Sequence, residues 1–375
     1  MVQNVSMVYK LIQFILRIYL PVVFKRLEFR GLENVPQDKP VIFAVNHQNA
    51  FLDGILVALK LRRPVFFLTR SDVFKGRWVV KIFKILNLVP IFRRQDGAGD
   101  ITTKNRETFK YCIKELEKKK PILIFPEGES EPIHHLFDLK KGVARLAFEA
   151  EAKNNFKLGL HVVPVVINYE NHFVPGKKVF VNYLKPILIS EYKNLYVENQ
   201  VRSMSIFLKK LQQAMRESVI HISGDYVKFK RRYWRGIIRQ SRNDKEIIAA
   251  IKSIPQDSTQ FSKEGYKWHR EKYRYNKPRP LLSRVFYSFI CLPGFFLFLP
   301  TIFITKLILA KVKDESFYLS ITVLSWLFFG LIQIAIMAIY IWNYTDWDIF
   351  VSSLLVIFTL GYITIRNFYK PIKSR

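Results

Sequence analysis

Short apolar runs alternate with longer stretches of mixed apolar and polar residues between residues 41 and 218. The runs are continuously apolar, as in strands buried on both faces, and the mixed stretches place apolar residues at helical spacing. The predicted strands are 41–45, 64–69, 121–126, 162–169 and 179–184. The predicted helices are 54–60, 73–88, 104–120, 142–154 and 192–218. This order predicts an α/β fold, with a mixed, mainly parallel sheet covered by helices on both faces.

The N-terminal stretch is apolar but not uniformly so. Lys10, Gln13 and Arg17 fall on one face of an otherwise apolar helix over residues 5–24. Such a helix is expected to lie in a membrane interface rather than to span the bilayer. No small-residue cleavage site follows it, so a secretory signal is not expected.

The C-terminal hundred residues are the most apolar part of the chain. Residues 317–342 carry no charge and are long enough to span a bilayer with tilt, and residues 349–365 reach the lower limit for a span. Residues 285–309 contain Pro293 and Pro300. Two helix-breaking prolines favour a re-entrant or interfacial segment, and a third span is the alternative.

Charge around these segments predicts an orientation. Lysines precede the first predicted span and basic residues follow the last, whereas the link 343–348 carries two acids and no base. The positive-inside rule places the basic flanks in the cytosol and the link outside. We therefore expect an integral membrane protein with its α/β domain on the cytoplasmic side.

These patterns predict four regions along the chain. They are an interfacial amphipathic helix, an α/β domain, a basic helical linker and a membrane region, at 1–30, 31–220, 221–280 and 281–375.

Composition narrows the class of partner. Sixty basic against thirty acidic residues give a net charge of +30, which calls for an anionic partner: a nucleic acid, a membrane surface or an acidic substrate. A hydrophobic content of 50% favours an anionic membrane surface and membrane lipids over nucleic acid. Residues 228–245 concentrate basic side chains, either as a solvated helix face or as a patch against anionic head groups. The two cysteines indicate neither a disulfide framework nor a metal cluster.

One histidine is placed where chemistry is plausible. Asn46 and His47 follow the predicted strand 41–45 at once, and Asp53 opens the next predicted helix. A carboxylate there can accept from one imidazole nitrogen, fix the tautomer and raise the basicity of the other nitrogen. The alternative is that both side chains are solvated loop residues.

Four blocks, in order, resemble the glycerolipid acyltransferase family of glycerol-3-phosphate and lysophosphatidic acid acyltransferases. The first is Asn46-His47, five residues and Asp53, one residue longer than the commonest spacing of the family. The second block, residues 89–96, resembles the family's arginine block. The third, residues 124–130 with the lysines of 140–142, resembles its Phe-Pro-Glu-Gly motif. The fourth, residues 163–167, resembles its apolar Pro-containing strand. Glu129-Ser130 stands where the family often has Thr-Arg-Ser, so a positive charge expected there is missing.

The resemblance implies transfer of an acyl group from acyl-CoA or acyl-carrier protein to a glycerol phosphate or lysophosphatidic acid, with no cofactor and no metal. It implies that His47 is the general base and that Asp53 orients it. The substrate-binding residues that it implies are Arg93 with Arg94 as the fallback, Glu127 for glycerol hydroxyls, Gly128 for close approach, Asn46 and Lys140.

Other functions stay open from the sequence. The acceptor could be a lyso-aminolipid or another polar-lipid alcohol, or the chain could be a non-catalytic lipid-binding scaffold. Nucleic-acid binding is suggested by net charge alone and is not expected beside membrane spans.

Overall fold

The computed structural model describes residues 2–93, 100–221 and 292–367, with side chains from residue 7 onward. Its centre is an eight-stranded sheet in the order β1-β7-β6-β2-β5-β3-β4, with β8 also paired to β6. The strands are β1 Arg26–Arg30, β2 Val41–Val45, β3 Phe66–Arg70, β4 Leu88–Ile91, β5 Ile122–Ile124, β6 His161–Tyr169, β7 Lys178–Tyr183 and β8 Ile187–Leu188. Only the pairs of β6 with β7 and β8 are antiparallel. The predicted mixed, mainly parallel sheet is therefore confirmed.

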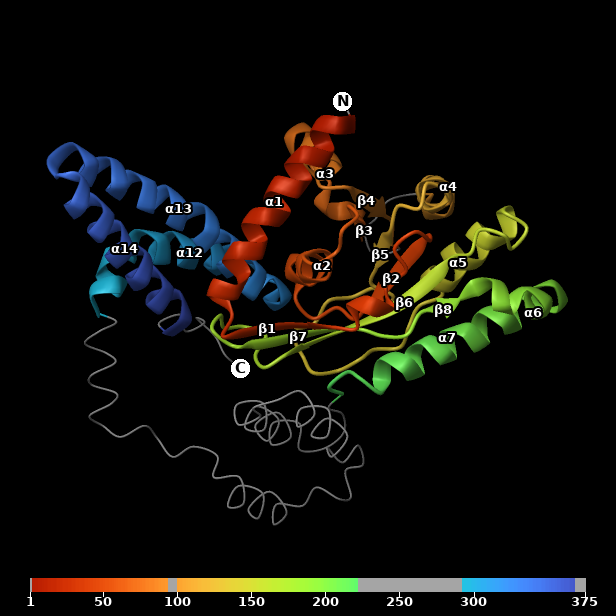
Figure 1. Cartoon of the computed structure of the whole chain (residues 1–375). Helices are drawn as coiled ribbons and strands as arrows, with labels where there is room; N and C mark the ends of the chain where they lie inside the picture. The colour runs from red at the N-terminus through yellow and green to blue at the C-terminus, as the bar shows by residue number, and fades with distance from the viewer. Residues whose placement is uncertain (1, 94–99, 222–291, 368–375) are drawn as a thin grey trace, which may run out of the picture.

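Helices cover the sheet on both faces because its central strands are apolar on both. In β2, Val41 and Phe43 pack into one core, whereas Ile42 and Ala44 pack into the other, as alternation along a strand requires. The first core is shared with α1, α2 and the C-terminal helices, and the second with α4, α5 and α7. Figure 1 shows α1 and α2 on one side of the sheet and α7 on the other.

The helices of the α/β part follow the predicted periodicity. They are α2 Ala50–Ala58, α3 Arg77–Ile85, α4 Ile101–Glu117, α5 Gly142–Lys153, α6 Lys193–Glu198 and α7 Gln200–Arg216. The single helix predicted over 192–218 is wrong, since Asn199 leaves the helical region at φ −153°. Its side chain accepts from the Arg202 N–H, so Asn199 ends α6 and caps α7.

Two edge strands were not predicted. No strand was predicted before residue 41, yet β1 forms at Arg26–Arg30 and pairs in parallel with β7. Charged residues alternate along β1, and all five of its side chains are half-buried, as suits a strand at the edge of a sheet. At the opposite edge β4 contains Pro90, another edge-strand feature.

The apolar ends of the chain form helices α1 Val2–Val23, α12 Leu299–Lys311, α13 Tyr318–Tyr344 and α14 Trp347–Asn367. Two helical stretches, Glu315–Tyr344 and Trp347–Ile365, are long and apolar enough to cross a membrane. Residues 292–297 are also helical, with a turn at Phe298 before α12. Whether 285–309 re-enters or lies in the interface stays a prediction, as do the four region boundaries, and the basic linker lies outside the described residues apart from residue 221.

Candidate active site

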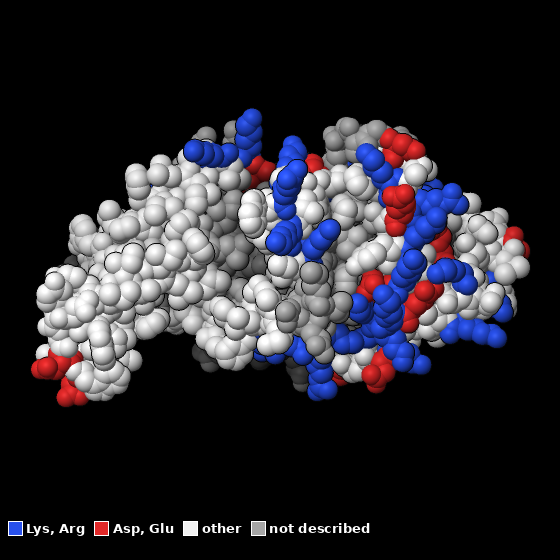
Figure 2. Space-filling view, turned by 90° about the horizontal axis from the view of Figure 1, so that it is seen from above, with Lys and Arg blue, Asp and Glu red and all other residues white. Residues whose placement is uncertain are grey.

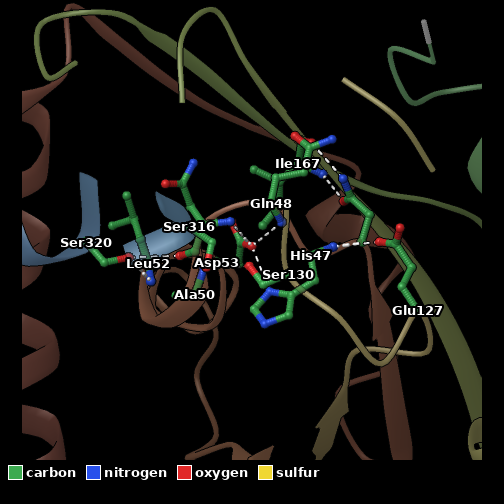
Figure 3. A network of polar contacts seen from close by, with 12 residues as sticks. His47, Gln48, Ala50, Leu52, Asp53, Glu127, Ser130, Ile167, Ser316 and Ser320 are labelled. Carbon is green, nitrogen blue, oxygen red and sulfur yellow. Dashed lines mark hydrogen bonds and ion pairs between the residues drawn. The ribbon is translucent and has the colours of Figure 1, made fainter. Parts of the chain in front are cut away.

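His47 and Asp53 face each other where β2 ends and α2 begins. The imidazole Nδ1 lies 2.9 Å from Asp53 Oδ2. The pair forms despite the five residues between them because the chain bends at Gln48 and Asn49 before α2 begins at Ala50. The predicted pairing of these two side chains is what the geometry shows (Figure 3).

The Asp53 carboxylate is fully buried and surrounded by donors. The backbone N–H groups of Gln48 and Asn49 each donate to Oδ2 at 2.7 Å. The Tyr169 hydroxyl donates to Oδ1 at 2.6 Å, and burial raises the pKa of that phenol. A carboxylate held by these three donors has a fixed orientation, so it presents an acceptor to Nδ1–H and leaves Nε2 to carry the lone pair.

The His47 ring is also held across its face. It stacks on Phe125, with ring centroids 3.7 Å apart and planes 12° apart. The side chain is 16% exposed, and Nε2 makes no hydrogen bond to any described residue. The ring therefore presents Nε2 as its open edge, which is the arrangement of a general base awaiting a substrate hydroxyl.

Glu127 supports this histidine from behind. Its Oε1 accepts the His47 backbone N–H at 2.7 Å and its Oε2 accepts the Phe137 N–H at 2.8 Å. Burial raises the pKa of this carboxyl to about 8, against the lowering effect of the two backbone donors. With 2% of its surface exposed, Glu127 positions the His47 backbone, and this geometry differs from the predicted contact with glycerol hydroxyls.

Asn46 likewise has a structural partner instead of an open face. Its amide exchanges two hydrogen bonds with the backbone of Ile167, at 3.0 Å to the carbonyl and 2.7 Å from the N–H. The fully buried side chain thus extends the pairing of β2 with β6 by one step. The structure thus gives Asn46 a backbone partner, and its substrate-binding role stays a prediction.

Two cations gather beside Gly128. Arg93 Nη1 donates to the Gly128 carbonyl at 3.2 Å. Gly128 has φ +75°, a conformation that favours glycine, and a Cβ there would lie 3.0 Å from Cδ of the Lys140 side chain, which would have to shift. Lys140 Nζ also lies 3.4 Å from Glu129 Oε1, so the acid that replaces the expected arginine partly offsets this charge. Arg94 lies outside the described residues.

A chain of contacts joins these groups into one site. Arg93 contacts Gly128, the neighbouring Glu127 holds the His47 backbone, and His47 contacts Asp53. Sequence reasoning missed Tyr169, which looked like the last residue of a buried strand. Within the described ranges, no three His, Cys, Asp or Glu residues are grouped so as to hold a metal ion.

The chain is similar to known acyltransferases over part of its length. The family model described as Acyltransferase matches residues 26–168. The chain is 28% identical over 162 residues to a chloroplastic 1-acyl-sn-glycerol-3-phosphate acyltransferase of Arabidopsis thaliana, a match covering 43% of this chain and 41% of the relative. It is 30% identical over 123 residues to glycerol-3-phosphate O-acyltransferase 2 of Saccharomyces cerevisiae, a match covering 32% of this chain and 16% of the relative.

Among solved structures, the chain is similar to the 1-acyl-sn-glycerophosphate acyltransferase PlsC of Thermotoga maritima. The TM-score is 0.40 at 21% identity, over 56% of this chain and 81% of that chain. The chain thus spans less than half the length of the curated relatives that it matches.

Proposed function

Residues 26–168 form a domain of the acyltransferase family, and from that premise we propose that the protein moves a fatty acyl group from an acyl thioester to a glycerol phosphate or lysophosphatidic acid in glycerolipid synthesis. The observation that carries the proposal is the His47–Asp53 pair, 2.9 Å apart, with Nε2 open and two cations beside Gly128. The curated relatives act, by their names, on acceptors of this class.

The reaction follows from the geometry of the pair. His47 Nε2 takes the proton of the acceptor hydroxyl while its oxygen attacks the thioester carbonyl. The C–O bond of the new ester forms, the C–S bond breaks, and the leaving thiolate takes the proton back from the imidazolium. Asp53 stabilises the transient positive charge on the ring, and general-base catalysis of this kind contributes about 10²- to 10⁴-fold.

The positive charge of Arg93 and Lys140 at Gly128 is proposed to favour an acceptor that carries a phosphate. Arg93 donates to the Gly128 carbonyl and the Lys140 side chain lies beside Gly128, and their positive charge would attract an acceptor phosphate. The acyl donor is proposed to be acyl-CoA or acyl-carrier protein.

The surface of the molecule supports work at a membrane. Two polar side chains of α1 contact the end of α2: Gln13 Nε2 donates to the Ala58 carbonyl at 2.7 Å, and Arg17 Nε donates to the Leu59 carbonyl at 2.7 Å. These carbonyls end α2, where unpaired acceptors and the negative end of the helix dipole attract donors. The exposed side chains of α1 are mainly apolar, with Phe14 60% exposed, and Lys10 and Arg17 are exposed among them.

A second helix extends this surface. On α3, Trp78 is 78% exposed and Ile82 52% exposed, with the exposed basic residues Arg77 and Lys81 beside them. Lys and Arg gather over the α/β part in Figure 2, whereas the C-terminal helices are almost bare of charge on that face. We propose that α1 and α3 contact an anionic lipid surface and that α13 and α14 cross the membrane, which would make lipid acceptors directly accessible.

The test is acyl incorporation in isolated membranes or detergent by wild type and His47→Ala. A loss of at least about 10²-fold is expected for a folded variant. His161→Ala is the matched control, because His161 begins β6 beside Val41, at the opposite end of β2 from His47. Activity of His47→Ala equal to wild type would overturn the base assignment, whereas no acyl incorporation by wild type would favour a lipid-binding scaffold.

The acceptor is identified by a panel. Glycerol 3-phosphate, a lysophosphatidic acid and a lyso-aminolipid are each offered with labelled acyl-CoA and with acyl-carrier protein. Incorporation into either phosphate acceptor is expected. Incorporation only into the lyso-aminolipid would keep acyl transfer and overturn the acceptor.

A further inference from the structure

A C-terminal helix reaches into the catalytic turn. Ser320, on the first turn of α13, donates its Oγ–H to the Asn49 carbonyl at 2.9 Å and accepts the Leu52 N–H at 3.1 Å. Its side chain is 1% exposed. Beside it, the rings of Phe51 and Phe317 meet edge to face with centroids 5.2 Å apart. Figure 3 shows Ser320 beside Leu52, on the α2 side of Asp53.

The turn that Ser320 contacts sets the position of Asp53. The Asn49 N–H donates to Asp53 Oδ2, and the Asn49 carbonyl also receives the Leu52 and Asp53 N–H groups at 2.9 and 3.4 Å. Asn49 is therefore tied to the carboxylate through its amide and to α2 through its carbonyl. Any rotation of this peptide would move the partner of His47.

This turn is poorly stabilised by its own residues. Ala50 has φ +33°, a left-handed backbone conformation that is unfavourable for a residue with a side chain. Asn49 stands at the N-cap position of α2 without a side-chain capping bond. Both polar atoms of its buried side chain find no hydrogen-bond partner among the described residues. The hydroxyl of Ser320 supplies, from 271 residues away in the chain, a contact that the turn does not provide for itself.

We propose that Ser320 is a positioning residue of the His47–Asp53 pair, so that α13 is part of the support of the active site in addition to any role as an anchor. The inference rests on the proposed function, since it assigns Ser320 to that same pair. Ser320 touches no reacting atom: it fixes the Asn49 peptide, which in turn fixes Asp53.

The primary experiment compares Ser320→Ala with Ser325→Ala in the full-length protein. Ser325 is a buried serine of the same helix, 7% exposed, and makes no hydrogen bond to the catalytic turn. Losing the Ser320 bonds is expected to lower kcat by roughly tenfold with KM little changed, because the loss affects the orientation of the base and not substrate binding. Ser325→Ala is expected to keep wild-type kcat, and Ser320→Thr, which keeps a hydroxyl, should recover most of the loss.

A double-mutant cycle separates positioning from general stability. If Ser320 acts through Asp53, Ser320→Ala costs nothing further in an Asp53→Asn background. A merely structural serine would lower activity by the same factor in both backgrounds, and that result overturns the inference. Wild-type kcat in Ser320→Ala overturns it as well.

Hydrogen exchange gives a readout that needs no activity. Exchange over residues 48–53 should be faster in Ser320→Ala and unchanged in Ser325→Ala, because the Leu52 N–H and the Asn49 carbonyl lose a partner. Unchanged exchange in Ser320→Ala contradicts the proposal. If wild type transfers no acyl group to any acceptor, the proposed function fails while this measurement still decides whether α13 holds the turn.

Discussion

A single phenol completes the hydrogen-bonding environment of the Asp53 carboxylate. The Tyr169 hydroxyl donates a hydrogen bond to Asp53 Oδ1 at 2.6 Å, and the Tyr169 side chain is fully buried. Tyr169→Phe removes that donor and leaves the ring in place, so the buried carboxylate has one fewer hydrogen bond to orient it. We expect kcat to fall about tenfold and the free energy of unfolding to fall by about 1–3 kcal/mol.

The neighbouring strand provides a matched control for this substitution. Tyr183 is equally buried and donates to the Val57 carbonyl at 2.6 Å, away from the carboxylate. Tyr183→Phe should show a comparable loss in denaturant unfolding with kcat unchanged. Equal losses of kcat in the two variants would mean that the Tyr169 bond matters only for folding.

The titration of Glu127 is expected to make the stability of the folded protein depend on pH. Burial raises its pKa to about 8 in the folded protein, from 4.5 for an ordinary glutamate carboxyl. The unfolded chain therefore releases this proton first. The stability that the protonated carboxyl contributes is fully present below pH 4.5 and is lost as pH rises toward 8. In Glu127→Gln this side chain cannot ionise, so the stability of wild type relative to the variant should fall over that range and level off above it.

The measurement is thermal or denaturant unfolding of the purified protein at several pH values between 5 and 8.5. Glu127→Gln also replaces one acceptor oxygen with an amide, which lowers its stability by a constant amount. Glu107→Gln, an exposed position on α4, is the control for general effects of removing a carboxylate. A wild-type-minus-Glu127→Gln difference that does not change with pH would show that this carboxyl titrates alike in both states.

At the scale of elements, the sequence predicted the strands and helices whose hydrophobic pattern is evident within the element itself. The strands β2 and β6 are apolar on both faces, so their runs of Val and Ile differ clearly from the more polar segments on either side in the sequence. Edge strands lack that signal: β1 alternates charged residues with apolar ones, and β4 contains a proline. The break at Asn199 was missed because α6 and α7 both keep helical spacing on either side of it.

The candidate site divides in the same way. His47 and Asp53 could be named because their pairing needs only one strand end and the next helix turn. The hydrogen bonds of Asn46 and Glu127 could not be predicted, since their partners, Ile167 and the Phe137 N–H, are fixed only when the sheet and the following loop assemble. The contacts of Gln13 and Arg17 on α1 also depend on the assembled fold, because the carbonyls at the end of α2 supply their acceptors.

At the scale of the whole molecule, α13 connects the C-terminal helices to the α/β part. Its first residues, from Leu319 to Trp326, include most of the buried side chains of the helix, and they pack against the α/β part. The Tyr19 hydroxyl of α1 donates to the Val323 carbonyl at 2.8 Å, which ties the N-terminal helix to the same region. Residues 327–344 remain, and 18 residues of helix rise about 27 Å, close to the thickness of a bilayer core. The α/β part therefore packs against the end of α13 that follows the 306–313 lysines, the end for which the positive-inside rule predicts a cytosolic location.

This arrangement predicts which positions are accessible from each side of a sealed membrane. In a background with Cys112→Ser and Cys291→Ser, single cysteines are placed by Asp346→Cys in the link after α13, by Lys313→Cys before it, and by Glu198→Cys on α6. A membrane-impermeant maleimide applied to intact cells should label the first position, because the positive-inside rule predicts that the acidic link lies outside. The other two should react only after permeabilisation. Labelling of Glu198→Cys in intact cells would place the catalytic domain outside, and labelling of all three would mean that α13 does not cross the bilayer.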